Sequence, residues 1–189
     1  IAGIYPITPA SPMAEKVDVL ASKGEINFWG NKVKVIEMES EKGAIATVHG
    51  ALQAGVLATT YTASQGLLLM IPSIYKMAGE MLPGVIHVAA RSLSTHSLSI
   101  FGDHQDIYAV RQTGACMLSS SSVEEAYHMA MVSHLASIKS SLPFINFFDG
   151  FRTSHEIDKV KEIDLSKLDT LIDQKDLRMF RDNGMISGA

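Results

Sequence analysis

The stretch Ile4-Tyr-Pro-Ile-Thr-Pro-Ala-Ser-Pro12 decides how this chain folds, together with the later stretch Val35-Ile-Glu-Met-Glu-Ser-Glu-Lys-Gly43. In each stretch, apolar residues that suit a strand run into polar residues that suit the start of a helix. Open α/β sheets build their sites at such junctions, because the carboxyl ends of parallel strands meet at one edge. The two stretches therefore predict an α/β fold with a site at this edge.

The rest of the chain continues the alternation of short apolar runs with helix-compatible stretches, which is typical of βαβ units and a parallel sheet. We expect a parallel sheet of about six strands flanked by helices, with strands over 2–7, 32–38, 59–63, 85–89, 116–118 and 144–148. Helices are expected over 12–23, 40–54, 64–79 and 122–140. Pro72 predicts a break in the third helix, because proline lacks an amide hydrogen. Ser122 followed by Glu125 predicts a capping box at the start of the fourth.

Charge and cysteine content restrict the class of protein. The 189 residues include 16 basic and 20 acidic side chains and a single cysteine, Cys116. This balance predicts no surface for nucleic acid. One thiol cannot hold an iron–sulfur cluster, which needs about four. The longest apolar run, 66–75, is well short of the roughly 20 residues that cross a membrane, and we expect no secretory signal. The prediction is a cytoplasmic protein without a membrane or nucleic-acid partner.

Residue types alone leave the candidate site residues open. Glu37, Glu39 and Glu41 suit a solvated acidic turn, favoured by the positive end of a helix. Thr8 lies between two prolines. It is either a structural threonine of a turn or a residue whose hydroxyl is presented at the end of a strand. Arg91 follows an apolar strand. It is either a structural ion-pair partner or a receptor for a carboxylate, because a guanidinium can bind a carboxylate with two parallel hydrogen bonds.

The cluster Asp103-His-Gln-Asp106 contains the residue types of a metal site or an acid–base pair. Its spacing lacks the ligand pattern of a zinc motif. We therefore expect a hydrogen-bonded loop that shapes a pocket or a dimer interface. No glycine-rich dinucleotide motif or phosphate loop occurs in the chain, which argues against a nucleotide-binding module.

Further motifs follow in order: Tyr61-Thr-Ala-Ser-Gln-Gly-Leu-Leu-Leu-Met-Ile-Pro72, His87-Val-Ala-Ala-Arg91, Ser99-Ile-Phe-Gly-Asp-His-Gln-Asp106 and Phe147-Phe-Asp-Gly-Phe-Arg-Thr-Ser-His-Glu156. With the two opening stretches, they resemble the first domain of the pyruvate:ferredoxin (or flavodoxin) oxidoreductases. These thiamine-diphosphate enzymes oxidatively decarboxylate pyruvate onto coenzyme A. The resemblance covers about residues 1 to 160 and implies the fold that binds the aminopyrimidine ring of the cofactor.

The resemblance also implies roles for three residues. Glu41 matches the activating glutamate, whose contact with N1′ of the aminopyrimidine favours the imino tautomer that takes the thiazolium C2 proton. Thr8 matches a threonine that touches substrate and cofactor, and Arg91 matches the arginine that binds the pyruvate carboxylate. The family usually has two serines after the second proline, where this chain has Ala10 and Ser11. This departure leaves Thr8 in place but changes the residues next to it.

For the whole enzyme, the resemblance implies anaerobic metabolism in a homodimer that yields acetyl-CoA and carbon dioxide. Electrons would pass through 4Fe-4S clusters to ferredoxin or flavodoxin. The clusters, Mg²⁺, the diphosphate and coenzyme A handling would belong to segments absent here. We expect a fragment without its first helix, inactive alone, with a pyrimidine-binding domain over 1–157 and a linker or the start of the next segment over 158–189.

Two alternatives stay open. One is a sibling 2-oxoacid:ferredoxin oxidoreductase with another substrate, which substrate trials on the complete protein would separate from a pyruvate enzyme. The other is a non-catalytic α/β assembly module, which would not bind thiamine diphosphate even with the rest of the polypeptide present.

Overall fold

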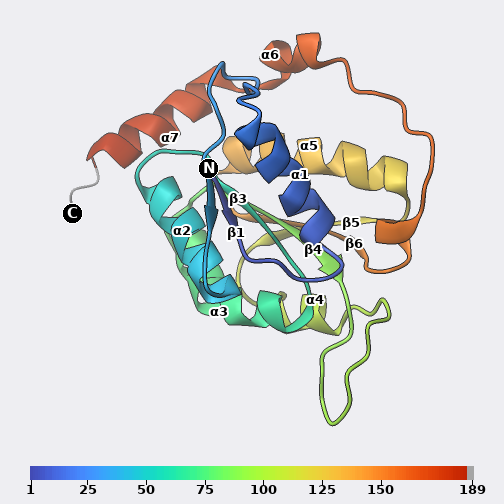
Figure 1. Cartoon of the computed structure of the whole chain (residues 1–189). Coiled ribbons are helices and arrows are strands. Elements are labelled where there is room, and N and C mark those ends of the chain that lie inside the picture. The colour runs from blue at the N-terminus through green and yellow to red at the C-terminus, as the bar shows by residue number, and fades with distance from the viewer. Residues whose placement is uncertain (187–189) are drawn as a thin grey trace.

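A computed structural model describes residues 1–186 and contains one six-stranded sheet (Figure 1). All neighbouring strands pair in parallel, in the order β2-β1-β3-β4-β6-β5. The strands are β1 (Ala2–Ile4), β2 (Val35–Glu37), β3 (Thr59–Thr62), β4 (Val85–Ala90), β5 (Cys116–Ser120) and β6 (Phe144–Asp149). The predicted α/β fold with a parallel sheet of six strands is confirmed.

Helices cover both faces of the sheet, as buried parallel strands require. Right-handed crossovers place α1 and α5 on one face and α2, α3 and α4 on the other, where α3 packs against both α2 and α4 (Figure 1). The helices are α1 (Ser11–Ser22), α2 (Glu41–Gln53), α3 (Ser64–Gly79), α4 (Gln105–Val110), α5 (Val123–Ser140), α6 (Leu168–Leu171) and α7 (Gln174–Ile186), with short 3₁₀ turns η1 (Thr153–His155) and η2 (Leu165–Lys167). Among these described helices, none is long and apolar enough to cross a membrane.

Serine side chains cap two of the helices. The Ser40 hydroxyl accepts a hydrogen bond from the amide of Gly43, 3.2 Å away, so that Glu41 becomes the first residue of α2. The Ser122 hydroxyl accepts from the amide of Glu125 at 3.2 Å, as the capping box predicts. The returning bond differs from the prediction, because the Glu125 carboxylate accepts from the amide of Ser121 instead of Ser122.

Several elements differ from the sequence-based expectation: β2 begins at Val35, β5 extends to Ser120, and helix α4 was not expected. Strand β1 ends at Ile4, because the Ile7 carbonyl accepts hydrogen bonds from the amides of Ala10 and Ser11 and so belongs to the turn into α1. Helix α3 continues through Pro72, so the expected break is wrong. Pro72 lies on the exposed side of the helix, while Ile74 and Met77 are fully buried. Burial of that apolar side offsets the hydrogen bond that proline removes.

The main core lies between the sheet and the layer of α2 and α3. It brings together fully buried side chains of both helices and the central strands, namely Ile45, Val48, Leu52, Leu67, Met70, Ile74, Met77, Ile86, Val88 and Ile145. Gly3 in β1 allows α2 to come close to the sheet, since a Cβ there would lie 2.6 Å from the Ala44 carbonyl oxygen. This close approach fixes where α2 begins relative to β1.

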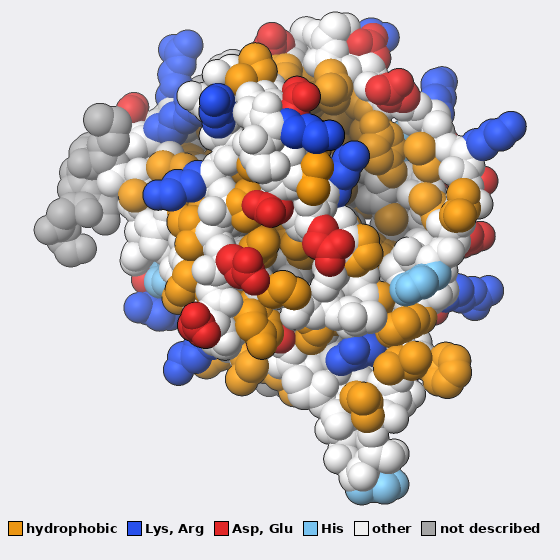
Figure 2. All heavy atoms as spheres, viewed as in Figure 1, with side chains coloured by type: hydrophobic (Ala, Val, Ile, Leu, Met, Phe, Trp, Pro, Cys, Tyr) orange, Lys and Arg blue, Asp and Glu red, His pale blue; other side chains and the backbone are white. Residues whose placement is uncertain are grey.

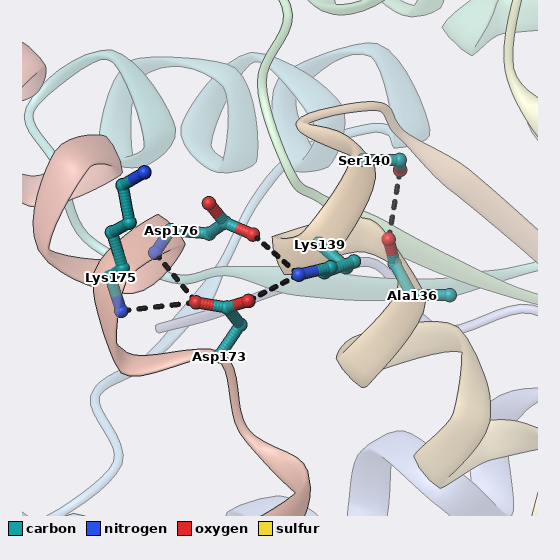
Figure 3. A network of polar contacts seen from close by, with 6 residues as sticks. All are labelled: Ala136, Lys139, Ser140, Asp173, Lys175 and Asp176. Atoms are coloured by element: carbon teal, nitrogen blue, oxygen red, sulfur yellow. Dashed lines mark hydrogen bonds and ion pairs between the residues drawn. The ribbon is translucent and has the colours of Figure 1, made fainter.

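The charged segment after residue 158 folds back onto this domain. Leu168, Ile172, Leu177 and Phe180 join the main core cluster. An ion pair between Lys139 of α5 and Asp173, with Asp176 3.5 Å from the same ammonium, ties α7 to α5 (Figure 3). The hydrogen bond from Lys139 lowers the pKa of Asp173 to about 2. Such exposed pairs add little stability, so burial of the apolar residues holds the segment in place.

A loop between β4 and α4 projects from the body of the molecule (Figure 1). It exposes the apolar side chains of Leu98, Ile100 and Phe101. On the face shown in Figure 2, hydrophobic side chains occur near this projection and also over the rest of the surface, among acidic and basic side chains. The loop therefore offers an apolar surface next to the carboxyl edge of the sheet, from which it starts.

Replacing Leu177 by alanine tests whether α7 is part of the domain's cooperative unit. Leu177 is 1% exposed, whereas Leu171 at the end of α6 is 57% exposed. We expect Leu177→Ala to lower the free energy of unfolding by about 2 to 4 kcal/mol, and the matched control Leu171→Ala to change it by less than about 0.5 kcal/mol. Urea unfolding followed by circular dichroism measures both. Equal stabilities of the two variants would show that α7 unfolds separately.

Candidate active site

Four strand ends bring the candidate residues to one edge of the sheet. Thr8 follows β1, Glu41 follows β2, Gly66 lies in the first turn of α3 after β3, and Arg91 follows β4. Strand β1 pairs with β2 on one side and with β3 on the other, so the chain reverses its direction of travel across the sheet there. Such a switch point opens a crevice at the carboxyl ends, where α/β proteins bind ligands.

Glu41 is held as a buried carboxylate at the start of α2. The residue is 7% exposed, and no donor among residues 1–186 makes a hydrogen bond to its carboxylate. The positive end of the helix dipole favours a negative charge at this position. A carboxylate that is buried but left without protein donors is available to a donor from a ligand. The solvated acidic turn does not describe Glu41, whereas Glu39 is exposed in the turn before α2 and Glu37 is exposed at the end of β2.

Gly66 lets the α3 backbone lie directly against Glu41. A Cβ at Gly66 would come within 2.7 Å of Glu41 Cγ and 2.8 Å of Glu41 Oε1. The same Cβ would lie 2.6 Å from Thr62 Oγ1. Only a residue without a side chain therefore leaves room for the Glu41 carboxyl and the Thr62 hydroxyl at this place.

The Thr62 hydroxyl is a feature that sequence analysis missed. It is fully buried and has no hydrogen-bond partner in the part of the chain that the structure describes. Buried polar groups are usually paired, so an unpaired hydroxyl beside a buried carboxylate indicates a place where a polar ligand atom belongs. Its sequence signal was the threonine at the end of a β-branched strand, four residues before Gly66.

Arg91 and Thr8 are brought into contact although 83 positions separate them in the sequence. Arg91 Nη1 donates a hydrogen bond of 2.7 Å to the Thr8 carbonyl oxygen. Arg91 is 9% exposed, and among the described residues its buried Nε has no hydrogen-bond partner. No carboxylate in residues 1–186 forms an ion pair with it. A buried guanidinium without a counter-ion favours the binding of an anion, so the anion-receptor hypothesis fits better than a structural ion pair.

Thr8 itself presents a free side chain at this edge. The residue is exposed, and within the described residues its hydroxyl makes no hydrogen bond, while its carbonyl is occupied by Arg91. Pro9 and Ala10, which follow it, are buried. The turn therefore anchors the backbone on both sides of the Thr8 carbonyl and leaves the hydroxyl available to a ligand held by Arg91.

The segment that contains Asp103 and Asp106 is hydrogen-bonded, but it is only partly a loop, because Gln105 and Asp106 begin helix α4. Asp106 is completely buried, and its Oδ2 accepts hydrogen bonds from the backbone amides of Ser64 at 2.8 Å and Arg91 at 3.1 Å. Burial raises the pKa of its carboxyl, while these backbone bonds act in the opposite direction. Gln105 Oε1 accepts from the amide of Leu93 and closes the base of the projecting loop. No group of three or more potential metal ligands occurs within residues 1–186.

Gly66→Ala tests the close contact between α3 and Glu41. Alanine is the better helix former, but its methyl group must displace the buried Glu41 and Thr62 side chains, which costs about 1 to 3 kcal/mol. The control is Gly79→Ala at the other end of α3, where nothing lies within 4 Å of the new Cβ. We expect Gly66→Ala to be less stable than Gly79→Ala in thermal unfolding. If the two variants are equally stable, the contact is not as close as described.

Comparison with known proteins assigns this domain to one family. The model described as "Pyruvate flavodoxin/ferredoxin oxidoreductase, thiamine diP-bdg" matches residues 1–187. The pyruvate-flavodoxin oxidoreductase of Klebsiella pneumoniae is 59% identical over 185 residues, which are 98% of this chain and 16% of that protein. The pyruvate:ferredoxin oxidoreductase of Moorella thermoacetica is 57% identical over 185 residues, with the same 98% and 16% coverage.

A solved structure supports the same assignment. The 2-oxoglutarate:ferredoxin oxidoreductase from Magnetococcus marinus matches with a TM-score of 0.67 and 25% identity, over 78% of this chain and 25% of that chain. The family resemblance and the fold predicted from the motifs are both confirmed. The chain spans only 16% of the length of the two curated relatives. It therefore belongs to the pyruvate flavodoxin/ferredoxin oxidoreductase family, in which it corresponds to the thiamine-diphosphate-binding domain.

Proposed function

We propose that this chain is the part of a pyruvate:ferredoxin or flavodoxin oxidoreductase that binds the aminopyrimidine of thiamine diphosphate and the carboxylate of pyruvate. The complete enzyme would convert pyruvate and coenzyme A into acetyl-CoA and carbon dioxide and pass the electrons to ferredoxin or flavodoxin. The observation that carries the proposal is the buried Arg91 guanidinium, which contacts Thr8 and has no carboxylate partner within the described chain.

The residues beside Gly66 fit the aminopyrimidine ring. A carboxyl without protein donors and an unpaired buried hydroxyl lie together there, from Glu41 and Thr62. An aminopyrimidine offers ring nitrogens and an exocyclic amine, which match one acceptor and one hydroxyl. Thiamine diphosphate, when bound, would supply a nucleophilic carbon for the 2-oxo group and a ring able to accept electrons.

Glu41 would hold a proton at N1′ of the aminopyrimidine. A carboxyl can share a proton with a basic ring nitrogen at hydrogen-bond distance, and no protein donor among the described residues competes with that contact at Glu41. Its position at the start of α2, beneath the α3 backbone, restricts the carboxyl to a small set of orientations. An acid–base group of this kind contributes about 10²- to 10⁴-fold to a rate.

Arg91 and Thr8 would orient pyruvate. The buried, unpaired Nε of Arg91 is available to a substrate carboxylate, while Nη1 is occupied by the Thr8 carbonyl. A carboxylate held by a guanidinium has a defined plane, which directs the adjacent 2-oxo carbon. The Thr8 hydroxyl, free at the same turn, would donate to an oxygen of the substrate.

A sibling enzyme for another 2-oxo acid is the second candidate. The structural relative from Magnetococcus marinus is named for 2-oxoglutarate. Arg91 and Thr8 would contact only the 2-oxo acid group, which all such substrates share. The curated relatives named for pyruvate are far more similar in sequence, which favours pyruvate. Turnover of pyruvate and 2-oxoglutarate by the complete enzyme separates these candidates. A non-catalytic α/β module would bind no thiamine diphosphate in that same complete protein.

The remaining functions are assigned to the part of the polypeptide outside this chain. These are the Mg²⁺ that accompanies the diphosphate, the 4Fe-4S clusters, coenzyme A handling and the contact with ferredoxin or flavodoxin. We take 1–157 as the pyrimidine-binding domain and 158–189 as the connection to the following domains, anchored on α5. The exposed apolar loop next to Arg91 suits contact with those domains in a cytoplasmic homodimer.

Glu41→Gln in the complete enzyme tests the proton-holding role. The amide keeps the shape of the side chain but cannot release a proton, so we expect exchange of the C2 hydrogen of bound thiamine diphosphate to slow by about 10²- to 10⁴-fold. Deuterium exchange monitored by NMR measures this step. The matched control is Glu39→Gln, because Glu39 is exposed two positions earlier. Exchange at the unmodified rate in Glu41→Gln would contradict the assignment.

Arg91→Ala in the complete enzyme tests the carboxylate receptor. A lost charged hydrogen bond is worth about 1.5 to 3 kcal/mol, so kcat/KM for pyruvate should fall by about ten- to a hundredfold or more. Affinity for thiamine diphosphate should change much less. Arg111→Ala is the control, because Arg111 is exposed and contacts Tyr108 through its guanidinium. A loss of cofactor affinity with normal pyruvate kinetics would assign Arg91 to the cofactor instead.

A further inference from the structure

We propose that Asp106 is a positioning residue for the pyruvate site, where its carboxylate joins the backbone of Arg91 to the start of α3. The proposal rests on the function proposed above and extends it to a residue that would not touch the substrate. Its basis is the arrangement of three strand-end segments around one buried side chain.

Asp106 connects segments that are far apart in the sequence. Its Oδ2 accepts from the amide of Ser64, 42 positions away, and from the amide of Arg91, 15 positions away. Its Oδ1 accepts from the amide of Ile107 in α4. All of these donors are backbone groups, and Asp106 has no exposed surface. A single carboxylate therefore fixes the exit of β4, the entry to α3 and its own helix relative to one another.

The hydrogen bond from the Ser64 amide to Asp106 stabilises an unfavourable backbone conformation of Ser64. Ser64 has φ of 50°, in the left-handed region that non-glycine residues rarely adopt. Such a residue keeps its conformation only where surrounding contacts hold it. Here the contacts are two hydrogen bonds. The Ser64 amide donates to the Asp106 carboxylate, and the Ser64 hydroxyl donates to the Ser92 carbonyl oxygen at 2.7 Å. Both link the start of α3 to the segment that contains Arg91.

The consequence reaches all three candidate site residues. Arg91 is held directly through its amide, and it contacts the Thr8 carbonyl through Nη1. Gly66, two residues after Ser64, lies against the carboxyl of Glu41. If Ser64 relaxes toward an ordinary conformation, the first turn of α3 moves relative to Arg91. Displacements of about 1 Å at a reacting centre can reduce a rate by about a hundredfold.

Asp106→Asn in the complete enzyme removes this function with little change in shape. The asparagine side chain has only one acceptor oxygen. Its NH₂ group must therefore face at least one of the three backbone N–H groups, and two donors that face each other cannot form a hydrogen bond. We expect kcat/KM for pyruvate to fall by about ten- to a hundredfold, mainly through a higher KM. The matched control is Asp103→Asn, since Asp103 is exposed and, among residues 1–186, accepts a hydrogen bond only from the nearby amide of Gln105.

A double-mutant cycle separates positioning from a general loss of structure. If Asp106 acts through Arg91, Asp106→Asn should reduce kcat/KM by less than about threefold in enzyme that already contains Arg91→Ala. An undiminished effect in that background, or normal pyruvate kinetics in Asp106→Asn alone, would overturn the proposal. If Asp106→Asn is not recovered folded, Asp106→Glu replaces it in the cycle, because it keeps the charge but moves the acceptors by one methylene, and the same two outcomes decide.

Hydrogen–deuterium exchange supplies a readout that does not depend on activity. Loss of the Asp106 acceptors should speed exchange in peptides that contain the amides of Ser64 and Arg91, and leave peptides from α5 and α7 unchanged. Faster exchange throughout the domain, or none at those two amides, would contradict the positioning role. Failure of the proposed function is recognised separately, because unmodified complete enzyme would then not turn over pyruvate.

Discussion

Parallel pairing of β1 with both β2 and β3 is the constraint on which the rest of this molecule depends. Because strands in one direction end at one edge, the turns that follow β1, β2, β3 and β4 must meet there. Because each strand needs a crossover to the next, helices must cover both faces. The crevice, its lining and the two helical layers therefore follow from one pairing arrangement.

Close backbone approach is the second requirement of this edge. Gly3 lets α2 come near β1, and Gly66 lets α3 lie against Glu41 and Thr62. A methyl group at either position would force its neighbours apart. The same geometry that packs helix onto strand thus places the Glu41 carboxyl and the Thr62 hydroxyl next to the α3 backbone at Gly66.

Several unsatisfied or strained groups lie at the carboxyl edge of the sheet. Within residues 1–186, the Arg91 Nε and the Thr62 hydroxyl are buried without partners, and Ser64 is in a left-handed conformation. Each feature is unfavourable for folding, and each is held in place by contacts from distant parts of the chain. Hydrophobic burial between the sheet and α2 and α3 provides the stability that tolerates them. This distribution is expected when a rigid scaffold supports a ligand site.

The amino-acid sequence by itself determined the class of fold and the position of Glu41. Local patterns were sufficient there: apolar runs of strand length, the Ser122 cap, and motifs that resemble one family in order along the chain. These signals involve only a few neighbouring residues, so they can be recognised without knowledge of the tertiary structure. Family resemblance, and not periodicity, distinguished Glu41 from Glu37 and Glu39.

Only the tertiary structure decided the contacts between distant segments. The strand order, the bond from Arg91 to Thr8, the three amides around Asp106 and the unpaired Thr62 hydroxyl all depend on residues that are far apart in sequence. The continuous helix through Pro72 and the return of α7 onto the core depend on burial that no local pattern specifies. Local preferences are small compared with the free energy of burying apolar surface, so packing overrides them wherever the two disagree.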